Sequence, residues 1–208
     1  MGADGVELDV RLCATGEVVV FHDATLDRLT GRVGRVDRLS LEALREVRID
    51  GESIPLLDEV LAELDGEFAI IVEIKSAGPR GLRALVDAVI SVIERHAAQR
   101  RVLVSSFDAT AIWWLHRSTG KIPGALVFHA EQQRPSREAW VRRLLRPIAL
   151  HPQHQLVAAD TMRRWQREGY LVNTWTVGEP AEARRLVELG VNALMTNDPA
   201  MLRAEFGY

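Results

Sequence analysis

The sequence has little of what marks a secreted, membrane-spanning or nucleic-acid-binding protein. It holds one cysteine, Cys13, which excludes an internal disulfide framework and favours a reducing, cytoplasmic compartment. No apolar run approaches the ~20 residues that cross a bilayer, so we expect no integral membrane segment. With 26 basic and 29 acidic residues the net charge is only −3, so we expect no nucleic-acid partner, and any anion must be bound by a local site.

The N-terminus also lacks the features of a leader. Residues 1–10 (MGADGVELDV) have no basic region followed by an apolar core, so they do not resemble a secretory signal. By Val6 the chain is already in a predicted strand, with no cap, turn or helix before it. A complete domain can start in this way, but a fragment or a truncated gene product does so more naturally.

What the sequence does contain is an alternation of apolar strands and amphipathic helices. The 47% hydrophobic and 26% charged residues are typical of a globular domain, and this alternation favours a parallel sheet with helices outside it. Strands are expected at Val6–Leu12, Val18–Phe21, Phe68–Ile74, Val102–Ser105, Ala125–Phe128, Ile148–Leu150, Val172–Val177 and Ala193–Met195. Helices are expected at Leu41–Val47, Leu56–Leu64, Gly81–Ala98, Ala109–Arg117, Ser136–Leu145, Thr161–Glu168 and Glu179–Leu189.

One connection breaks this alternation. Only residues 13–17 separate the first two strands, too few for a parallel crossover, so these strands should form an antiparallel hairpin. A turn centred on Thr15 and Gly16 would place Asp9 opposite His22, and a longer turn would shift this register by a residue or two. The second strand is then a flap rather than a barrel strand. Seven barrel strands remain, one short of the common eight-stranded barrel.

Acidic side chains gather at the ends of two predicted strands. Glu7 and Asp9 lie two residues apart and so project from the same face, where burial is costly unless a cation lies between them. Glu73 ends the apolar run from Phe68 and can supply a third carboxylate. Ligands that offer only oxygen suit Mg²⁺ or Ca²⁺ better than zinc. The alternative is a strand that carries ordinary solvent-facing charges.

Two basic side chains can complete such a site. Lys75, two residues after Glu73, offers a cation to a phosphate or a developing oxyanion, although a structural ion pair is the alternative. His22 can act as a general acid or base, because imidazole titrates near neutral pH, but a histidine here can also be a structural hydrogen-bonding group. Among the other histidines His151, near a strand end, is the one candidate, and a structural role is expected more often.

Taken together and in this order, eight sequence blocks resemble the glycerophosphodiester phosphodiesterases over nearly the whole chain. The blocks are residues 2–10 (GADGVELDV), 16–23 (GEVVVFHD), 26–31 (LDRLTG), 54–61 (IPLLDEVL), 72–75 (VEIK), 105–107 (SSF), 172–177 (VNTWTV) and 190–199 (GVNALMTNDP).

The resemblance implies a (β/α)8 TIM barrel that hydrolyses glycerophosphodiesters, which are small-molecule substrates, to glycerol phosphate and an alcohol. It implies that a divalent cation, Mg²⁺ or Ca²⁺, is bound by three carboxylates, and that Lys75 contacts the phosphate. His22 would be one of two histidines that share the acid and base roles, and Trp175 would give the substrate an apolar contact, although core packing is an equal alternative. The metal ligands implied are Glu7, Asp9 and Glu73.

The sequence departs from the family pattern at its start. The family's His-Arg-Gly motif at the end of the first strand and its Glu-Asn-Thr segment are not found in residues 1–208. We therefore expect residues 1–208 to form a single domain of this family that lacks its first strand, its first helix, one catalytic histidine and the phosphate-binding arginine. Such a chain should be impaired. The alternatives are an inactive barrel that binds phosphate esters, and a related phosphodiesterase that acts on phospholipid headgroups. The sequence makes no prediction about the oligomeric state.

Overall fold

The computed structural model describes residues 2–64, 66, 68–76, 78–132 and 139–207. The pattern of contacts between Cα atoms divides the chain into two compact units. The first unit is Gly5–Pro123, and the second unit combines Met1–Asp4 with Gly124–Tyr208. The prediction of a single domain is therefore not tested by this division and stays a prediction.

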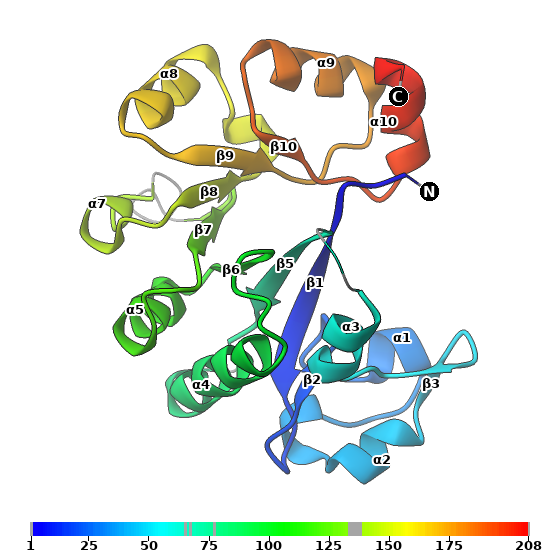
Figure 1. Cartoon of the computed structure of the whole chain (residues 1–208). Helices are drawn as coiled ribbons and strands as arrows, with labels where there is room; N and C mark the ends of the chain where they lie inside the picture. The colour runs from blue at the N-terminus through cyan, green and yellow to red at the C-terminus, as the bar shows by residue number, and fades with distance from the viewer. Residues whose placement is uncertain (1, 65, 67, 77, 133–138, 208) are drawn as a thin grey trace. The chain divides into compact units, whose positions relative to one another are not determined.

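The first unit is built on four strands, in the order β2, β1, β5 and β6 (Figure 1). The bounds are β1 (Gly5–Leu12), β2 (Val18–Val20), β5 (Ala69–Ile74) and β6 (Val102–Ser106). β5 pairs in parallel with both β1 and β6, whereas β2 pairs antiparallel with β1. Three helices complete the frame: α3 (Leu57–Glu63), α4 (Pro79–Arg95) and α5 (Ala109–Ser118).

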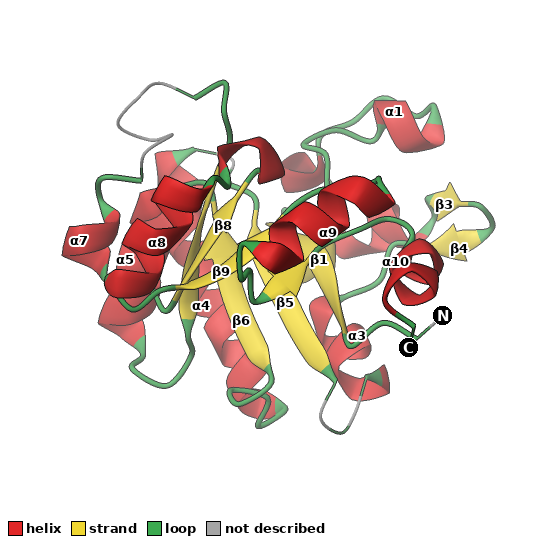
Figure 2. Ribbon diagram, turned by 90° about the horizontal axis from the view of Figure 1, so that it is seen from above, coloured by secondary structure: helices red, strands yellow, loops and turns green. Residues whose placement is uncertain are grey.

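Strand alternation sorts the side chains of this sheet between two faces. Leu8 and Val10 of β1 and Val72 of β5 are buried in a hydrophobic core that also takes in apolar residues of α3, α4 and α5. α3 and α4 cover this face of the sheet in both views (Figures 1 and 2). Because neighbouring side chains point to opposite faces, the odd-numbered residues of β1 and β5 project away from these helices. The acidic residues are among them.

The β1–β2 hairpin is antiparallel, as the short connection predicted, but its register differs from the one expected. Val10 pairs with Val20, and the backbone N–H of Phe21 donates to the carbonyl of Asp9 at 2.9 Å. Phe21 rather than His22 therefore lies opposite Asp9, and the expected register was wrong by one residue. The reason is the turn. It has three residues instead of two, and it closes with Gly16 at a φ of 98°, a conformation that glycine adopts without steric cost.

A compact excursion follows β2 in the first unit. It consists of α1 (Asp27–Thr30), the 3₁₀ turn η1 (Val36–Arg38), α2 (Leu41–Arg45) and a two-stranded hairpin of β3 (Arg48–Ile49) and β4 (Glu52–Ser53). The excursion has its own small apolar core, which includes Phe21 at the end of β2. This core fixes the position of the chain immediately after β2, where His22 stands.

The second unit holds four parallel strands in the order β7, β8, β9 and β10. Figure 2 shows α8 and α9 beside β8 and β9. The strands are β7 (Gly124–Phe128), β8 (Ala149–Pro152), β9 (Leu171–Thr174) and β10 (Ala193–Leu194). The helices are α7 (Arg142–Leu145), η2 (His154–Leu156), α8 (Ala159–Arg167), α9 (Pro180–Glu188) and α10 (Pro199–Phe206).

Most predicted elements are present, with ends that move by a few residues. The helix predicted at 136–145 starts in residues that lie outside the described part of the chain, and only Arg142–Leu145 of the remainder is helical. The predicted strand Val172–Val177 ends at Thr174. Within the described residues, no helix is both long and apolar enough to cross a membrane.

Candidate active site

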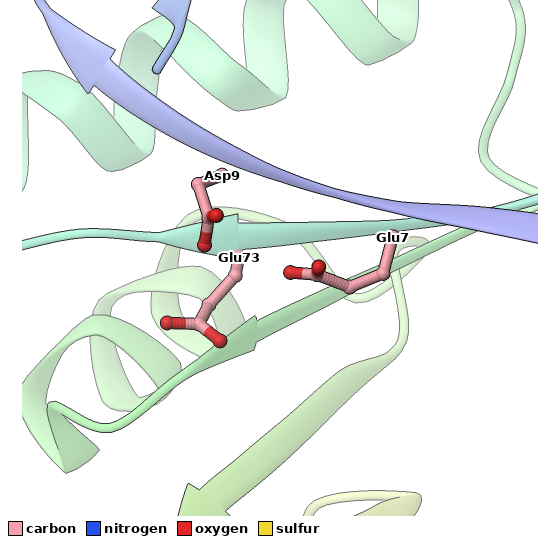
Figure 3. A group of neighbouring side chains, drawn as sticks. All are labelled: Glu7, Asp9 and Glu73. Atoms are coloured by element: carbon pink, nitrogen blue, oxygen red, sulfur yellow. The ribbon is translucent and has the colours of Figure 1, made fainter. Parts of the chain in front are cut away.

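Three carboxylates, two from the middle of β1 and one from near the C-terminal end of β5, converge on the sheet face that points away from α3 and α4. Asp9 pairs directly with Glu73 across the two parallel strands, and Glu7 precedes Asp9 by two residues on the same face. One carboxylate oxygen from each residue lies within 4.8 Å of the others. Figure 3 shows the three side chains pointing toward one another. The predicted convergence of Glu7, Asp9 and Glu73 is confirmed.

Lys75 closes the cluster from the C-terminal end of β5. Its Nζ lies 3.0 Å from Oδ1 of Asp9 and also forms an ion pair with Oε1 of Glu73. Burial opposes the charged form of the lysine, but the attraction of Glu73 and Asp9 outweighs it, so the pKa of Lys75 is raised. The ammonium also lies 5.5 Å from the centre of the Phe107 ring, a favourable cation–π distance. Lys75 is thus a permanent cation beside the carboxylates.

The carboxylates repel one another despite this lysine. Burial, together with the charges of Asp9 and Glu73, raises the pKa of Glu7 to about 7, against the lowering effect of Lys75. Burial is also the largest cause of the raised pKa of Glu73, to which Asp9 adds and which Lys75 and His22 oppose. A bound cation would offset the part of the Glu7 shift that comes from the charges of Asp9 and Glu73.

A divalent cation fits the residues present. All three ligand atoms are carboxylate oxygens, which Mg²⁺ and Ca²⁺ prefer. Oε1 of Glu73 is buried and forms an ion pair with the Lys75 ammonium, which also pairs with Asp9. One ammonium does not balance three carboxylates, and an excess of negative charge is costly to bury unless a cation binds it. The donor set therefore can hold a metal ion.

His22 follows β2 and is held by contacts that were not predicted from the sequence. Its Nδ1 lies 2.6 Å from Oδ1 of Asp23, and Arg28 in turn donates to Asp23 through Nε at 2.6 Å. The side chain of Arg11 donates twice to the backbone carbonyl of His22, at 2.7 and 3.0 Å. The adjacent His-Asp pair is a sequence signal for the first contact. No spacing rule would have identified Arg28 or Arg11.

The electrostatics of this group keep Asp23 charged. Hydrogen bonds from Arg28, and then from His22, hold the pKa of Asp23 well below its usual range. The side chain of His22 is 57% exposed, so it is open to solvent on the side away from Asp23. His22 also lowers the pKa of Glu73, which places its ring within electrostatic reach of the carboxylates.

Two further predicted residues lie in the second unit, where they are described by themselves. Nε1 of Trp175 donates to the backbone carbonyl of His151 at 2.9 Å. His151 is completely buried, its Nε2 lies 3.0 Å from Nδ2 of Asn173, and burial lowers its pKa to about 3. His151 is therefore a neutral acceptor for the Asn173 amide, which fits the structural role expected for it. The substrate contact expected of Trp175 stays a prediction.

Comparisons with known proteins identify the family and the fold of this chain. The Glycerophosphoryl diester phosphodiesterase family matches residues 1–201. The glycerophosphodiester phosphodiesterase of Caldanaerobacter subterraneus is 30% identical over 212 residues, which cover 97% of this chain and 85% of that protein.

Solved structures share the fold along the whole chain. An Oleispira antarctica phosphodiesterase in complex with the product sn-glycerol-3-phosphate has a TM-score of 0.88 and 22% identity, covering 100% of this chain and 86% of that one. A glycerophosphodiester phosphodiesterase from Thermotoga maritima has a TM-score of 0.79 and 26% identity, covering 99% and 86%.

These findings define first a class and then a family. The parallel α/β fold is that of the TIM-barrel phosphodiesterases, which confirms the predicted fold class. The chain belongs to the glycerophosphoryl diester phosphodiesterase family. The prediction that a first strand and helix are missing is not tested by these comparisons.

Proposed function

We propose that this protein hydrolyses glycerophosphodiesters to glycerol phosphate and an alcohol, with a divalent cation held by Glu7, Asp9 and Glu73. The observation that carries the proposal is the convergence of three carboxylate oxygens within 4.8 Å in a member of this family. The glycerol phosphate bound to the Oleispira antarctica relative supports a substrate of this small-molecule class. Oxygen ligands favour Mg²⁺ or Ca²⁺.

Each residue of the cluster then has a role that its surroundings support. The cation, when bound, supplies a Lewis acid that offsets negative charge on the phosphoryl oxygens. Glu7, Asp9 and Glu73 hold it, and in return its charge relieves their mutual repulsion. Lys75 binds a phosphate oxygen, since its ammonium is fixed at the edge of the cluster and stays protonated.

His22 carries out one of the two proton transfers of the hydrolysis, in which the attacking water loses a proton and the alcohol oxygen that leaves phosphorus gains one. Asp23 is ionised and can only accept a hydrogen bond, so Nδ1 of His22 carries a proton and Nε2 is the nitrogen that can exchange one. Arg28 holds Asp23, which contacts Nδ1 of the ring, and Arg11 holds the backbone carbonyl of His22, so both the ring and the backbone that carries it are positioned. A general acid or base positioned in this way contributes roughly 10²–10⁴-fold to a rate.

The alternative of an inactive phosphate-binding barrel is not favoured. Relatives named as glycerophosphodiester phosphodiesterases align with nearly the whole of this chain, and the carboxylates, Lys75 and His22 are all present. Activity is accordingly the expected result for the protein.

The test is the release of glycerol phosphate from glycerophosphocholine, measured with added Mg²⁺ or Ca²⁺ and again with a chelator. We expect release with the cation and its loss with the chelator. Glu73→Gln should lose this activity, whereas Glu94→Gln, a matched change on the exposed surface of α4, should keep it. Equal activity with and without the chelator would reject the cation, and equal activity in Glu73→Gln would reject the site.

A further inference from the structure

Ser105, near the end of β6, has a buried hydroxyl group that the fold does not use. The residue is 1% exposed, and its Oγ has no hydrogen-bond partner among the residues that the structure describes. The next residue, Ser106, is equally buried, but its Oγ donates to the carbonyl of Ile74 at 2.8 Å and accepts from the N–H of Asp108 at 3.1 Å. The hydroxyl of Ser106 thus makes two hydrogen bonds to the backbone, whereas that of Ser105 makes none among the described residues.

The strand register places Ser105 beside Glu73. β5 and β6 are parallel, and Glu73 pairs with Ser105. Val102 and Val104 of β6 are buried in the core beneath the helices, so by alternation Ser105 projects from the other face, the face of Glu73. Neighbouring strands lie about 4.8 Å apart, so paired side chains on one face of the sheet are neighbours. Ser105 therefore extends the row Asp9–Glu73 by one strand.

We propose that Ser105 is a positioning residue, whose hydroxyl donates a hydrogen bond to the Glu73 carboxylate when Glu73 binds the cation. This inference rests on the proposed metal site. A carboxylate that binds a metal through one oxygen is held in orientation by a hydrogen bond to the group, and the loss of such a partner typically weakens metal binding 10–100-fold. Ser105 is the hydroxyl that pairs with Glu73 in the strand register.

The burial of Ser105 argues against the other uses of a serine. At 1% exposure it lies deeper than Lys75, whose side chain is 17% exposed, so Lys75 rather than Ser105 is presented to a substrate. Ser105 also caps no helix, because the residue that caps α5 is Asp108, which accepts from the N–H of Thr110. The strand register makes the Glu73 carboxylate the acceptor that is paired with Ser105, although the Ser105 hydroxyl makes no hydrogen bond to it in the structure.

The test is calorimetric titration of Mn²⁺ into chelator-treated protein. We expect Ser105→Ala to weaken Mn²⁺ binding 10–100-fold, and Ser105→Cys, whose thiol is a weaker donor, to give an intermediate affinity. The control is Ser106→Ala. It removes a hydrogen bond to the backbone of β5, so it should lower the melting temperature while Mn²⁺ affinity stays within about threefold of the wild type. If Ser105→Ala does not fold, the Mn²⁺ affinity of the Ser105→Cys variant tests the role of Ser105.

The outcomes separate this inference from the proposal on which it rests. If the wild type and Glu73→Gln bind Mn²⁺ equally, the metal site itself is wrong. If Glu73→Gln weakens binding but Ser105→Ala and Ser105→Cys bind as the wild type does, only the role of Ser105 is wrong. A raised KM for glycerophosphocholine in Ser105→Ala, with unchanged Mn²⁺ affinity, would assign the hydroxyl to the substrate and overturn the positioning role.

Discussion

Polar residues of neighbouring strands lie together in both units of this protein, but their surroundings differ. In the first unit Glu7, Asp9 and Glu73 lie together, and burial, with the added repulsion of Asp9 and Glu73, raises the pKa of Glu7 to about 7. In the second unit His151 is fully buried, yet it is neutral and accepts from the amide of Asn173. The first group carries an excess of negative charge, whereas the second is a neutral pair joined by a hydrogen bond.

The difference illustrates how the residues of a ligand-binding site differ from polar residues that only stabilise the fold. A structural polar group satisfies its partners within the fold, because a buried group without a partner costs free energy. Thr174 illustrates this in the second unit, where its hydroxyl donates to the carbonyl of Pro152 at 2.8 Å. In the first unit the Ser105 hydroxyl has no hydrogen-bond partner among the described residues, and Asp9 and Glu73 share the single ammonium of Lys75, which leaves an excess of negative charge that a bound cation would offset. Lack of a partner is not sufficient by itself to identify a site, because Nε of Arg164 and Nε1 of Trp165 in the second unit also have no hydrogen-bond partner among these residues.

The largest effect should follow from changing a carboxylate of the first unit. Glu73→Gln removes a negative charge that the proposed cation needs, and the several kcal/mol of charge stabilisation supplied by a cation correspond to roughly 10³-fold in rate. Steady-state release of glycerol phosphate checks this. A loss of less than tenfold would mean that the cluster does not hold the catalytic cation.

His22 should give the next effect. Without its imidazole, His22→Ala should lower kcat by at least about 10²-fold, and Asp23→Asn should lower it less, because Asp23 acts only by holding Nδ1. The pH profile of kcat separates the two variants, since only Asp23→Asn keeps an imidazole that can titrate. If His22→Ala were as active as the wild type, a proton-transfer role for His22 would be excluded.

His151→Ala tests the structural role of the buried histidine in the second unit. It leaves the Asn173 amide without its buried acceptor, so we expect the free energy of unfolding to fall by about 1–3 kcal/mol from the lost hydrogen bond, with a further cost for the cavity. Denaturant unfolding measures the loss. Mn²⁺ affinity should not change, and a tenfold weaker affinity would contradict the structural assignment of His151.

The smallest effect concerns the pH dependence of stability. The pKa of Glu7 is raised from 4.5 to about 7 in the folded protein, so the folded state binds more protons than the unfolded state between these values. This contribution therefore lowers stability as the pH rises through that range. In chelator-treated protein, Glu7→Gln should have a higher melting temperature than the wild type at pH 8 and the same melting temperature at pH 4.

Adding Mn²⁺ should reverse that order at pH 8, because a ligand that binds only the folded state stabilises it, and Glu7→Gln has lost one of the ligands. Melting temperatures that stay in the same order with and without Mn²⁺ would contradict the role of Glu7.

Sequence patterns accounted for every described strand except β3 and β4, for the β1–β2 hairpin and for the convergence of the three carboxylates, because strand alternation and run length depend on local residues. They failed where geometry depends on a single backbone angle or on distant contacts. The register was wrong because Gly16 closes a three-residue turn. Arg28 was missed because its contact with Asp23 requires α1, an element that was not predicted.

Two other misses have different causes. Ser105 could not be recognised as unusual, since only the paired strands reveal that its hydroxyl is buried without a partner among the described residues. α10 (Pro199–Phe206) was missed although its start carries a signal. Asp198 accepts from the N–H of Met201 and Pro199 occupies the first turn, a common arrangement at helix N-termini.

The most direct test of the account is an anomalous-scattering map from crystals of this protein grown with Mn²⁺. The account predicts one strong peak at roughly 2.0–2.6 Å from a carboxylate oxygen of each of Glu7, Asp9 and Glu73, at distances normal for a cation with oxygen ligands. The peak should be lost in crystals of Glu73→Gln. A peak elsewhere in the molecule, or no peak between the three carboxylates at saturating Mn²⁺, would contradict it.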